Sequence, residues 1–289
     1  MTAEFSKIQA RLTSHGYTTE VVATSADPDS AKTLGHEASR ASSLVLACGG
    51  DGTLHGVVQG LAHTDAALGI IPLGTANALA RNLKLPLDPL AAVERLLTYE
   101  VRKIPLGGID SAEGSRYFAV MAGCGPDGTL VHELSQPGSS RLKARFGRTA
   151  YYAHAARLFW TRRWPSFQVE YRDRSTHQWA SENAVAVMAS RIPDLGGWFS
   201  GLTSASRLEE PWLRVQILRA PAQLALPAWV LSGRLGSPNP WLRTVEVDEI
   251  RCTPLSSRPV YAQADAEPLG PLPMTLRIVP NALSLLMPG

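Results

Sequence analysis

Cysteine is scarce in this sequence, and long apolar runs are absent. The three cysteines lie far apart, at positions 48, 124 and 252, so they indicate neither a disulfide framework nor a zinc site. The most apolar late stretch, residues 224–231, is interrupted by Pro227 and is far shorter than the about 20 residues that a membrane-spanning helix needs. We therefore expect a reduced, cytoplasmic protein without a transmembrane segment.

Charge of either sign is in no large excess. The formal net charge of +3 is too small to imply nucleic-acid binding, and no nucleic-acid partner is expected. With 45% hydrophobic and 18% charged residues the composition is that of a globular protein, and 289 residues are enough for two domains. The first residues carry an early acid, Glu4, and no apolar segment, so no signal peptide is expected.

Tryptophan is missing from the first 159 residues, and all seven tryptophans lie between positions 160 and 241. The same half of the chain is predicted to be an antiparallel β domain, because strand-like segments follow one another there through Gly and Pro turns. These segments are residues 117–121, 167–171, 184–190, 213–218, 244–252 and 260–264. This uneven distribution of tryptophan suggests that the two halves of the chain have different functions. The alternative is that the tryptophans pack in the core of a large domain.

The motif Cys48-Gly-Gly-Asp-Gly-Thr53 follows an apolar strand, residues 43–47, and leads into a helical pattern that ends near Leu61. Glycines let backbone N–H groups turn towards an anion at a helix N-terminus, so Gly49, Gly50, Gly52 and Thr53 are candidate phosphate-binding residues. Asp51 is unusual beside phosphates and suggests a magnesium-nucleotide complex. We expect it in a solvent-facing loop, where it contributes charge rather than core. The alternative is a simple glycine turn whose Asp caps the helix.

A second strand, loop and helix come directly after the first. Residues 67–71 form the strand, the loop contains Gly74 and Thr75, and the helix runs from about Asn77 to Leu83. Loops at the carboxyl ends of adjacent parallel strands are where open α/β sheets bind ligands, so Gly74, Thr75 and Asn77 join the candidate site. Around these two units the pattern predicts helices at 5–14, 31–41 and 87–99 and strands at 17–24 and 101–106.

The two motifs GGDGTLHGVVQGL and IIPLGTANALARNL, at this spacing, resemble the diacylglycerol kinase catalytic domain family, which includes bacterial lipid kinases and sphingosine kinases. The resemblance implies an α/β protein with an N-terminal Rossmann-like nucleotide-binding domain and a C-terminal antiparallel β-sandwich domain. The expected domains are residues 1–105, with a C-terminal return of residues 276–289, and residues 106–275. ATP and Mg²⁺ are the implied cofactors.

The resemblance also implies roles for individual residues. Thr24 corresponds to a position that contacts nucleotide. The segment from Gln263 to Gly270 is similar to an Asp-Gly-Glu motif of the family, in which Glu267 would accept the proton and Asp265 would be its partner. In an extended chain, residues at i and i+2 point to the same side, so these two carboxylates are expected to face one cleft together.

A structural magnesium site of bacterial relatives corresponds here to the segment Leu208-Glu-Glu-Pro-Trp212. The metal would be held by the Glu210 side chain and by the backbone carbonyls of Arg207 and Trp212. Two departures from the family stand out elsewhere. Ala266 takes a position where the family prefers Gly, which would be unfavourable by on the order of 1 kcal/mol if that position has a positive φ. An additional first strand with an Asn-Pro-x-Ser-Gly loop is normal in the family and is not present in this sequence.

Between positions 134 and 169 there are seven Arg or Lys residues and no Asp or Glu, together with apolar residues that include Phe159, Trp160 and Trp164. A basic amphipathic helix of this kind suits the surface of an anionic membrane. The alternative is a solvated basic face over a packed helix.

The sequence thus favours an ATP- and Mg²⁺-dependent lipid kinase that acts on the hydroxyl of a diacylglycerol-like or sphingoid lipid. The protein would be cytoplasmic and peripheral to the membrane, and a homodimer is left open. Two alternatives remain: a kinase for a soluble substrate, as NAD kinases share GGDGT, and a non-catalytic nucleotide- or lipid-binding protein.

Overall fold

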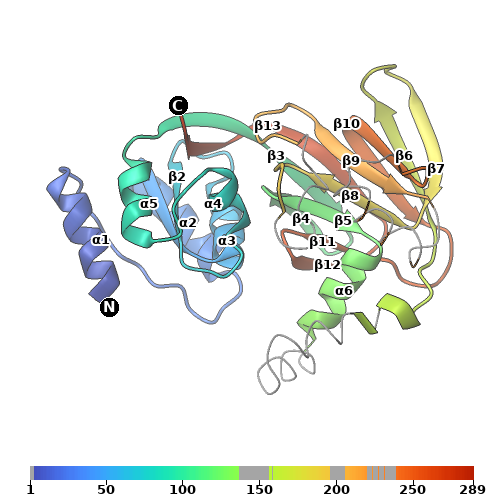
Figure 1. The fold of residues 1–289 in the computed structure, drawn as a ribbon, viewed down its shortest axis with the longest axis horizontal. Coiled ribbons are helices and arrows are strands. Elements are labelled where there is room, and N and C mark those ends of the chain that lie inside the picture. The colour runs from blue at the N-terminus through green and yellow to red at the C-terminus, as the bar shows by residue number, and fades with distance from the viewer. Residues whose placement is uncertain are drawn as a thin grey trace. The chain divides into compact units, whose positions relative to one another are not determined.

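The computed structural model describes residues 3–136, 156–157, 159–195, 206–219, 223, 227, 231 and 239–289 (Figure 1). Two compact units divide the chain. Unit 1 comprises Met1–Leu106 and Pro280–Gly289, and unit 2 comprises Gly107–Val279. Within the described ranges no helix is both long and apolar enough to cross a membrane.

Unit 1 is built from helices and parallel strands. Its elements are α1 (Ala3–Ser14), α2 (Ser30–Ala41), β1 (Leu44–Gly49), α3 (Asp51–Leu61), β2 (Ala67–Pro72), α4 (Ala78–Asn82), α5 (Pro89–Leu96), the first part of β3 (Glu100–Ser111) and the last part of β13 (Met274–Met287). β1 is parallel to β2, with Leu44 opposite Ala67, and β13 is parallel to β2, with Ser284 opposite Ala67. All six residues of β2 are buried, as expected of a central parallel strand. The predicted helices and the two strand-loop-helix units are therefore present.

Helices α2 and α3 pack closely because small residues line their contact. A Cβ on Gly60 would lie 2.2 Å from the Lys32 carbonyl oxygen, and a Cβ on Gly56 would lie 2.6 Å from the Ala31 Cβ. Glycine at these positions lets the two backbones approach. Gly56 therefore has a packing role in this chain.

The strand predicted at residues 17–24 is wrong. These residues form no strand, and the apolar side chains of Tyr17, Val21 and Val22 are 45%, 43% and 57% exposed. Among the described strands β1 pairs with β2 alone. β-branched residues favour a strand only where a neighbouring strand supplies hydrogen bonds and packing, and no such neighbour accompanies residues 17–24.

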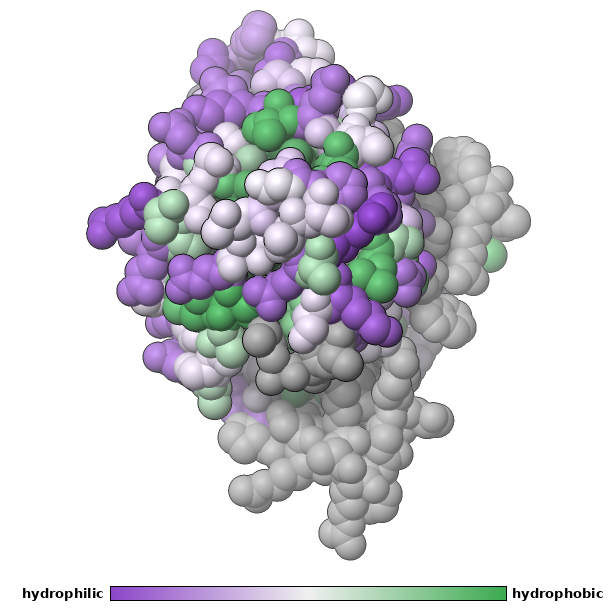
Figure 2. All heavy atoms as spheres, turned by 90° about the vertical axis from the view of Figure 1, so that its left-hand side faces the viewer, coloured by the Kyte–Doolittle hydropathy of each residue, from purple (hydrophilic) through white to green (hydrophobic). Residues whose placement is uncertain are grey.

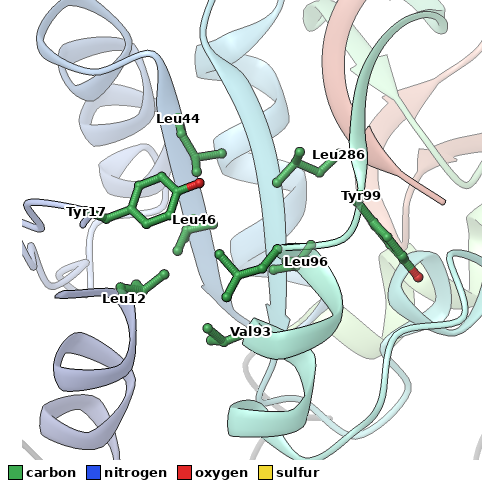
Figure 3. Close-up of a pocket in the computed structure, with 9 residues that line it drawn as sticks. Leu12, Tyr17, Leu44, Leu46, Val93, Leu96, Tyr99 and Leu286 are labelled. Carbon is green, nitrogen blue, oxygen red and sulfur yellow. The ribbon is translucent and has the colours of Figure 1, made fainter. Parts of the chain in front are cut away.

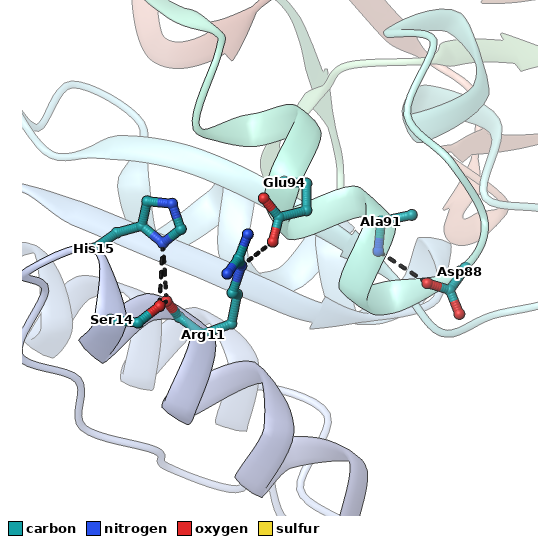
Figure 4. Close-up of polar contacts among 6 residues, drawn as sticks. All are labelled: Arg11, Ser14, His15, Asp88, Ala91 and Glu94. Carbon is teal, nitrogen blue, oxygen red and sulfur yellow. Dashed lines mark hydrogen bonds and ion pairs between the residues drawn. The ribbon is translucent and has the colours of Figure 1, made fainter.

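A small apolar groove of about 80 Å³ lies between α1, β1 and α5 in unit 1 (Figure 3). Its lining includes Leu12, Leu46 and Leu96. Nearby, Arg11 pairs with Glu94, and Asp88 caps α5 by accepting the Ala91 N–H at 2.8 Å (Figure 4). On the α1 side of the molecule apolar patches are scattered among hydrophilic residues (Figure 2). The groove has no glycine-rich loop and is not the candidate nucleotide site.

Unit 2 is an antiparallel β structure with one long described helix. Its elements are the rest of β3, then β4 (Gly114–Phe118), β5 (Met121–Cys124), α6 (Pro126–Ser135), β6 (Phe167–Asp173), β7 (Trp179–Ala184), β8 (Ala186–Ser190), β9 (Leu213–Leu218), β10 (Leu242–Pro254), β11 (Tyr261–Ala264), β12 (Glu267–Pro271) and the start of β13. The strand order runs β13-β10-β9-β8-β5-β11-β12, while β6 pairs with β10 and β7. β10 pairs with β9 along its first half and with β6 and β13 along its second, and its pairing with β6 is irregular between Val247 and Ile250.

Alternating burial produces the core of unit 2. Along β6, Phe167, Val169 and Tyr171 are buried and the residues between them are not, the period of two that a half-covered strand requires. The strands predicted at 167–171, 213–218 and 244–252 lie within β6, β9 and β10, whereas residues 117–121 span the break between β4 and β5. The predicted α/β fold with a C-terminal antiparallel β domain is confirmed. Helix α6 was missed, and most of the predicted basic helix lies outside the described residues.

Candidate functional site

The two glycine-rich loops of unit 1 touch through their backbones. A Cβ added to Gly74 would lie 2.5 Å from the Gly50 Cα, and one added to Gly50 would lie 3.2 Å from the Gly74 Cα. A side chain at Gly74 would clash with the Gly50 backbone, and one at Gly50 would be a tight fit, so glycine at both positions favours this approach. Gly49 has a similar constraint, because a Cβ added to it would lie 2.6 Å from the Thr53 Cβ. The sequence motifs thus meet as one surface at the ends of β1 and β2.

Asp51 joins these loops. Its Oδ2 accepts the backbone N–H of Asn77 at 2.9 Å, and its Oδ1 accepts that of Ala78 at 2.8 Å. The expectation that Asp51 contributes only charge to a solvent-facing loop was wrong, since the carboxylate is half-buried and satisfies the first amides of α4. The alternative, a capping role for Asp51, was right in kind. The helix whose first N–H groups it accepts is α4, however, and not α3, to which Asp51 itself belongs.

Two hydrogen bonds within the loop before α4 also fix its conformation. Asn77 Oδ1 accepts the Gly74 N–H at 3.0 Å, and Asn77 Nδ2 donates to the Gly74 carbonyl at 2.8 Å. Asn77 is 6% exposed and has φ +49° and ψ +49°, a left-handed conformation that Asn tolerates better than most residues. Gly74 and Thr75 remain exposed, and Thr24 lies in the exposed segment before α2.

The N-cap residue of α3 is Gly50, so no N-cap side chain is present to accept the first N–H groups of that helix. The amides of Asp51, Gly52 and Thr53 in its first turn have no acceptor within the helix, so they can bind an anion at the positive end of the dipole. Burial raises the pKa of the Cys48 thiol, just before this turn, to about 11, which disfavours the nucleophilic thiolate.

In unit 2, Asp265 and Glu267 belong to a tight hairpin. Ala264 pairs with Glu267, and the two residues between them, Asp265 and Ala266, have φ values of +49° and +67°. Such a turn has positive φ at both central positions. The expectation of an extended segment with both carboxylates on one side was therefore wrong, and Ala266 does occupy a position with positive φ.

The Asp265 carboxylate holds the short connection between β4 and β5. Its Oδ2 accepts the N–H of Ala119 at 2.9 Å, and its Oδ1 accepts those of Val120 at 2.9 Å and Met121 at 3.0 Å. Three amide donors fix the carboxylate in one orientation. Glu267 begins β12 and is half-buried. Asp265 therefore shapes the turn that presents Glu267.

A second half-buried acid, Asp127, supports the same hairpin. Gln263 Oε1 accepts the Ala266 N–H at 2.9 Å, and Gln263 Nε2 donates to Asp127 Oδ2 at 3.2 Å. Asp127 lies in the first turn of α6, and burial raises its pKa to about 6. The sequence analysis missed this link from Asp127 to the hairpin, because Gln263 lies 136 positions away.

At the predicted structural metal site the backbone carbonyls surround an arginine. Arg191 Nη1 donates to the carbonyl oxygens of Glu210 at 3.0 Å and Trp212 at 2.6 Å, and Nη2 donates to that of Leu208. The Glu210 Oε2 accepts the N–H of Arg207 at 3.3 Å. Nowhere in the described part of the chain do three His, Cys, Asp or Glu side chains gather as a metal cluster.

The region of this chain that matches a known protein family includes both glycine-rich loops. Residues 1–109 match the family model described as the diacylglycerol kinase catalytic domain. A curated relative, the diacylglycerol kinase of Bacillus subtilis (strain 168), is 30% identical over 207 residues, which cover 71% of this chain and 64% of the relative. The chain thus spans less than two thirds of that relative's length. The diacylglycerol kinase of Staphylococcus haemolyticus is 35% identical over 139 residues, 47% of this chain and 40% of that protein.

The fold is also similar to a solved structure. A crystal structure of a diacylglycerol kinase from Bacillus anthracis str. Sterne superposes with a TM-score of 0.73 at 19% identity, covering 98% of this chain and 91% of that one. At this identity the similarity shows the fold. Within residues 1–109 the glycine loops are local features that sequence alone could find. The contacts of Asp51, by contrast, reach residues 26 and 27 positions away.

Proposed function

We propose that this protein is an ATP-dependent lipid kinase that phosphorylates the hydroxyl of a diacylglycerol-like or sphingoid lipid. The observation that carries the proposal is the joined pair of glycine loops, in which Asp51 fixes the loop of Asn77 and Gly50 contacts Gly74. Phosphate groups need converging backbone N–H donors and room for close approach, and this arrangement supplies both. The names of the curated relatives support a lipid as the acceptor.

Phosphoryl transfer requires positioned phosphates and a proton acceptor. The amides of the segments 49–53 and 74–77 would bind the phosphates, and Thr24 stays a predicted nucleotide contact. The lipid hydroxyl oxygen would form a bond to the γ-phosphorus while the bond from that phosphorus to the β,γ-bridging oxygen breaks, releasing ADP. Glu267 would accept the hydroxyl proton. Asp265, held by three amides, would position the turn rather than take the proton itself.

Magnesium is the expected companion of the nucleotide, since it neutralises charge on the phosphates. Each Asp51 oxygen accepts one hydrogen bond from a backbone N–H and retains a lone pair for another partner. Asp51 therefore fits a role beside a magnesium-nucleotide complex while it still holds the second loop.

The proposal is tested with radiolabelled ATP, Mg²⁺ and a total lipid extract, followed by identification of the labelled product. A lipid phosphate is the expected product. Label that appears only in a soluble acceptor, with NAD as the added candidate, would favour the soluble-substrate alternative. ATP binding without any transfer would favour the non-catalytic alternative.

We also propose peripheral contact with an anionic membrane. Residues 141–155 lie outside the described chain, but at the end of the basic segment Trp160 is 60% exposed and Arg163 is exposed. Each Lys or Arg near such a surface contributes about 1 kcal/mol, so binding should be reversible and weaken with salt. Flotation should be stronger on anionic than on neutral vesicles, and Trp160→Ala should reduce it. Equal flotation on both vesicles would favour a solvated basic face.

A further inference from the structure

The loop of residues 206–212 surrounds a positive charge that belongs to the protein. Arg191 is 1% exposed, and its guanidinium donates to three backbone carbonyls, those of Leu208, Glu210 and Trp212. Backbone carbonyls that converge on one point carry partial negative charge and need a cation or donors there. Arginine provides both, because its planar group has several N–H donors and stays charged.

The charge of Arg191 is retained at neutral pH. Burial lowers its pKa to about 10, and the nearby Glu210 carboxylate opposes this shift. A buried guanidinium is stable only where hydrogen bonds replace its hydration. The loop supplies these bonds with carbonyls drawn from a short stretch of chain, so the guanidinium and the loop stabilise each other.

The same residues do not fit a divalent ion. Mg²⁺ requires oxygen ligands at about 2.0–2.1 Å in an octahedron, and here the Trp212 carbonyl is already bonded to Arg191 Nη1 at 2.6 Å. The Arg207 carbonyl accepts the Glu210 N–H at 3.3 Å within the turn. The Glu210 carboxylate faces the Arg207 N–H at 3.3 Å and Arg214 Nη2 at 3.8 Å. An added dication would lie among these positive groups, where like charges repel.

We propose that the Arg191 guanidinium replaces a structural metal ion in this chain. The loop of residues 206–212 then keeps its conformation without Mg²⁺, and the prediction of a metal held by Arg207, Glu210 and Trp212 does not apply. Arg191 is a positioning residue by this account. It follows the last residue of β8, and its backbone N–H donates to the Val120 carbonyl at 2.9 Å, in the same connection that Asp265 holds.

The test uses the whole protein without nucleotide or lipid, so it is independent of the proposed kinase activity. Thermal unfolding is followed in Mg²⁺, in Ca²⁺ and in EDTA, and bound metal is measured by elemental analysis. The wild-type Tm should be the same in all three solutions, with no stoichiometric divalent ion bound. Arg191→Met should lower the Tm by at least about 5 °C, because the carbonyls lose their donors. The matched control is Arg219→Met, which removes a partly exposed arginine directly after β9 and should change the Tm little.

Two further variants keep the test decisive if Arg191→Met does not fold. Arg191→Lys retains a charge and should lose less stability than Arg191→Met. Arg191→Ala opens the space between the carbonyls, and added guanidinium at low millimolar concentration should raise its Tm but not that of Arg219→Met. A stoichiometric divalent ion in the wild-type protein would overturn the proposal if EDTA removed it with a fall in Tm and Glu210→Gln abolished its binding.

Discussion

Asp51 and Asn77 are 26 positions apart and are joined by a hydrogen bond of 2.9 Å from the Asn77 backbone N–H to Asp51 Oδ2. A second bond, from the Ala78 N–H to Oδ1, completes the contact at 2.8 Å. Through this carboxylate the first glycine loop determines the conformation of the second. The proposed phosphate-binding surface is therefore a product of tertiary structure and not of either motif alone.

Asp51→Asn should separate the two loops. The amide keeps the size of the side chain, but it removes the charge and replaces one acceptor with a donor that faces the Ala78 or Asn77 N–H. Hydrogen bonds to charged groups contribute about 1.5–3 kcal/mol, so the free energy of unfolding should fall by an amount of this order. Urea denaturation measures the loss, and hydrogen exchange should show the amides of Asn77 and Ala78 less protected.

The control for Asp51→Asn is Asp65→Asn. The Asp65 side chain is fully exposed and its pair with Lys103 spans 3.4 Å, so this change should leave stability and exchange nearly unaltered. ATP binding should weaken in Asp51→Asn only. Unaltered protection of the Asn77 amide in that variant would contradict the account of the loops.

Ala266→Gly should stabilise the protein. Ala266 has φ +67°, a left-handed conformation that disfavours any side chain with a Cβ by about 1 kcal/mol. Removing the Cβ should raise the denaturation midpoint by an amount of this order without changing the slope. Ala264→Gly is the matched control: Ala264 is buried in β11 without a positive φ, so glycine there should be destabilising. A lower midpoint for Ala266→Gly would contradict the turn conformation.

Asp127 should make stability depend on pH. Its folded pKa of about 6 is above the ordinary 3.8, so the folded protein binds the proton more tightly than the unfolded chain. Its contribution to stability is fully present below about pH 4 and is lost as the pH rises through 6, a total of about 3 kcal/mol. Asp127→Asn cannot ionise and should flatten this part of the profile. Urea denaturation at several pH values between 4 and 7 measures the difference, and parallel profiles for the two proteins would exclude Asp127 as its source.

The sequence could predict those parts of the fold that depend on patterns within a short segment of the chain. The units around Gly49–Thr53 and Gly74–Asn77 combine an apolar run, a glycine turn and a helical period within about 20 residues, so they were found. The strand predicted at residues 17–24 failed because β-branched residues need a neighbouring strand, which is a property of the sheet and not of the segment.

The candidate site was less predictable because its supporting contacts are long-range. Asp265 was singled out, but its three amide partners lie 144 to 146 positions away, so its role in holding residues 119–121 could not be deduced. Arg191 had no motif at all. Its function depends on carbonyl groups, which every residue possesses and no sequence pattern marks.

The central claim is that this chain transfers phosphate from ATP to a lipid hydroxyl with Glu267 as the proton acceptor. Its most direct test compares the wild-type protein with Glu267→Gln in the transfer of label from ATP to diacylglycerol in mixed vesicles, with ATP affinity measured on both proteins. Loss of a general base typically lowers the rate by about 10² to 10⁴, while ATP affinity should hardly change because the proposed phosphate ligands are the loops of Asp51 and Asn77 and not Glu267. Labelled lipid phosphate from the wild-type protein and at least about a hundredfold less from Glu267→Gln, at equal ATP affinity, is the predicted result. Equal rates for the two proteins, or no labelled lipid from the wild-type protein, would contradict it.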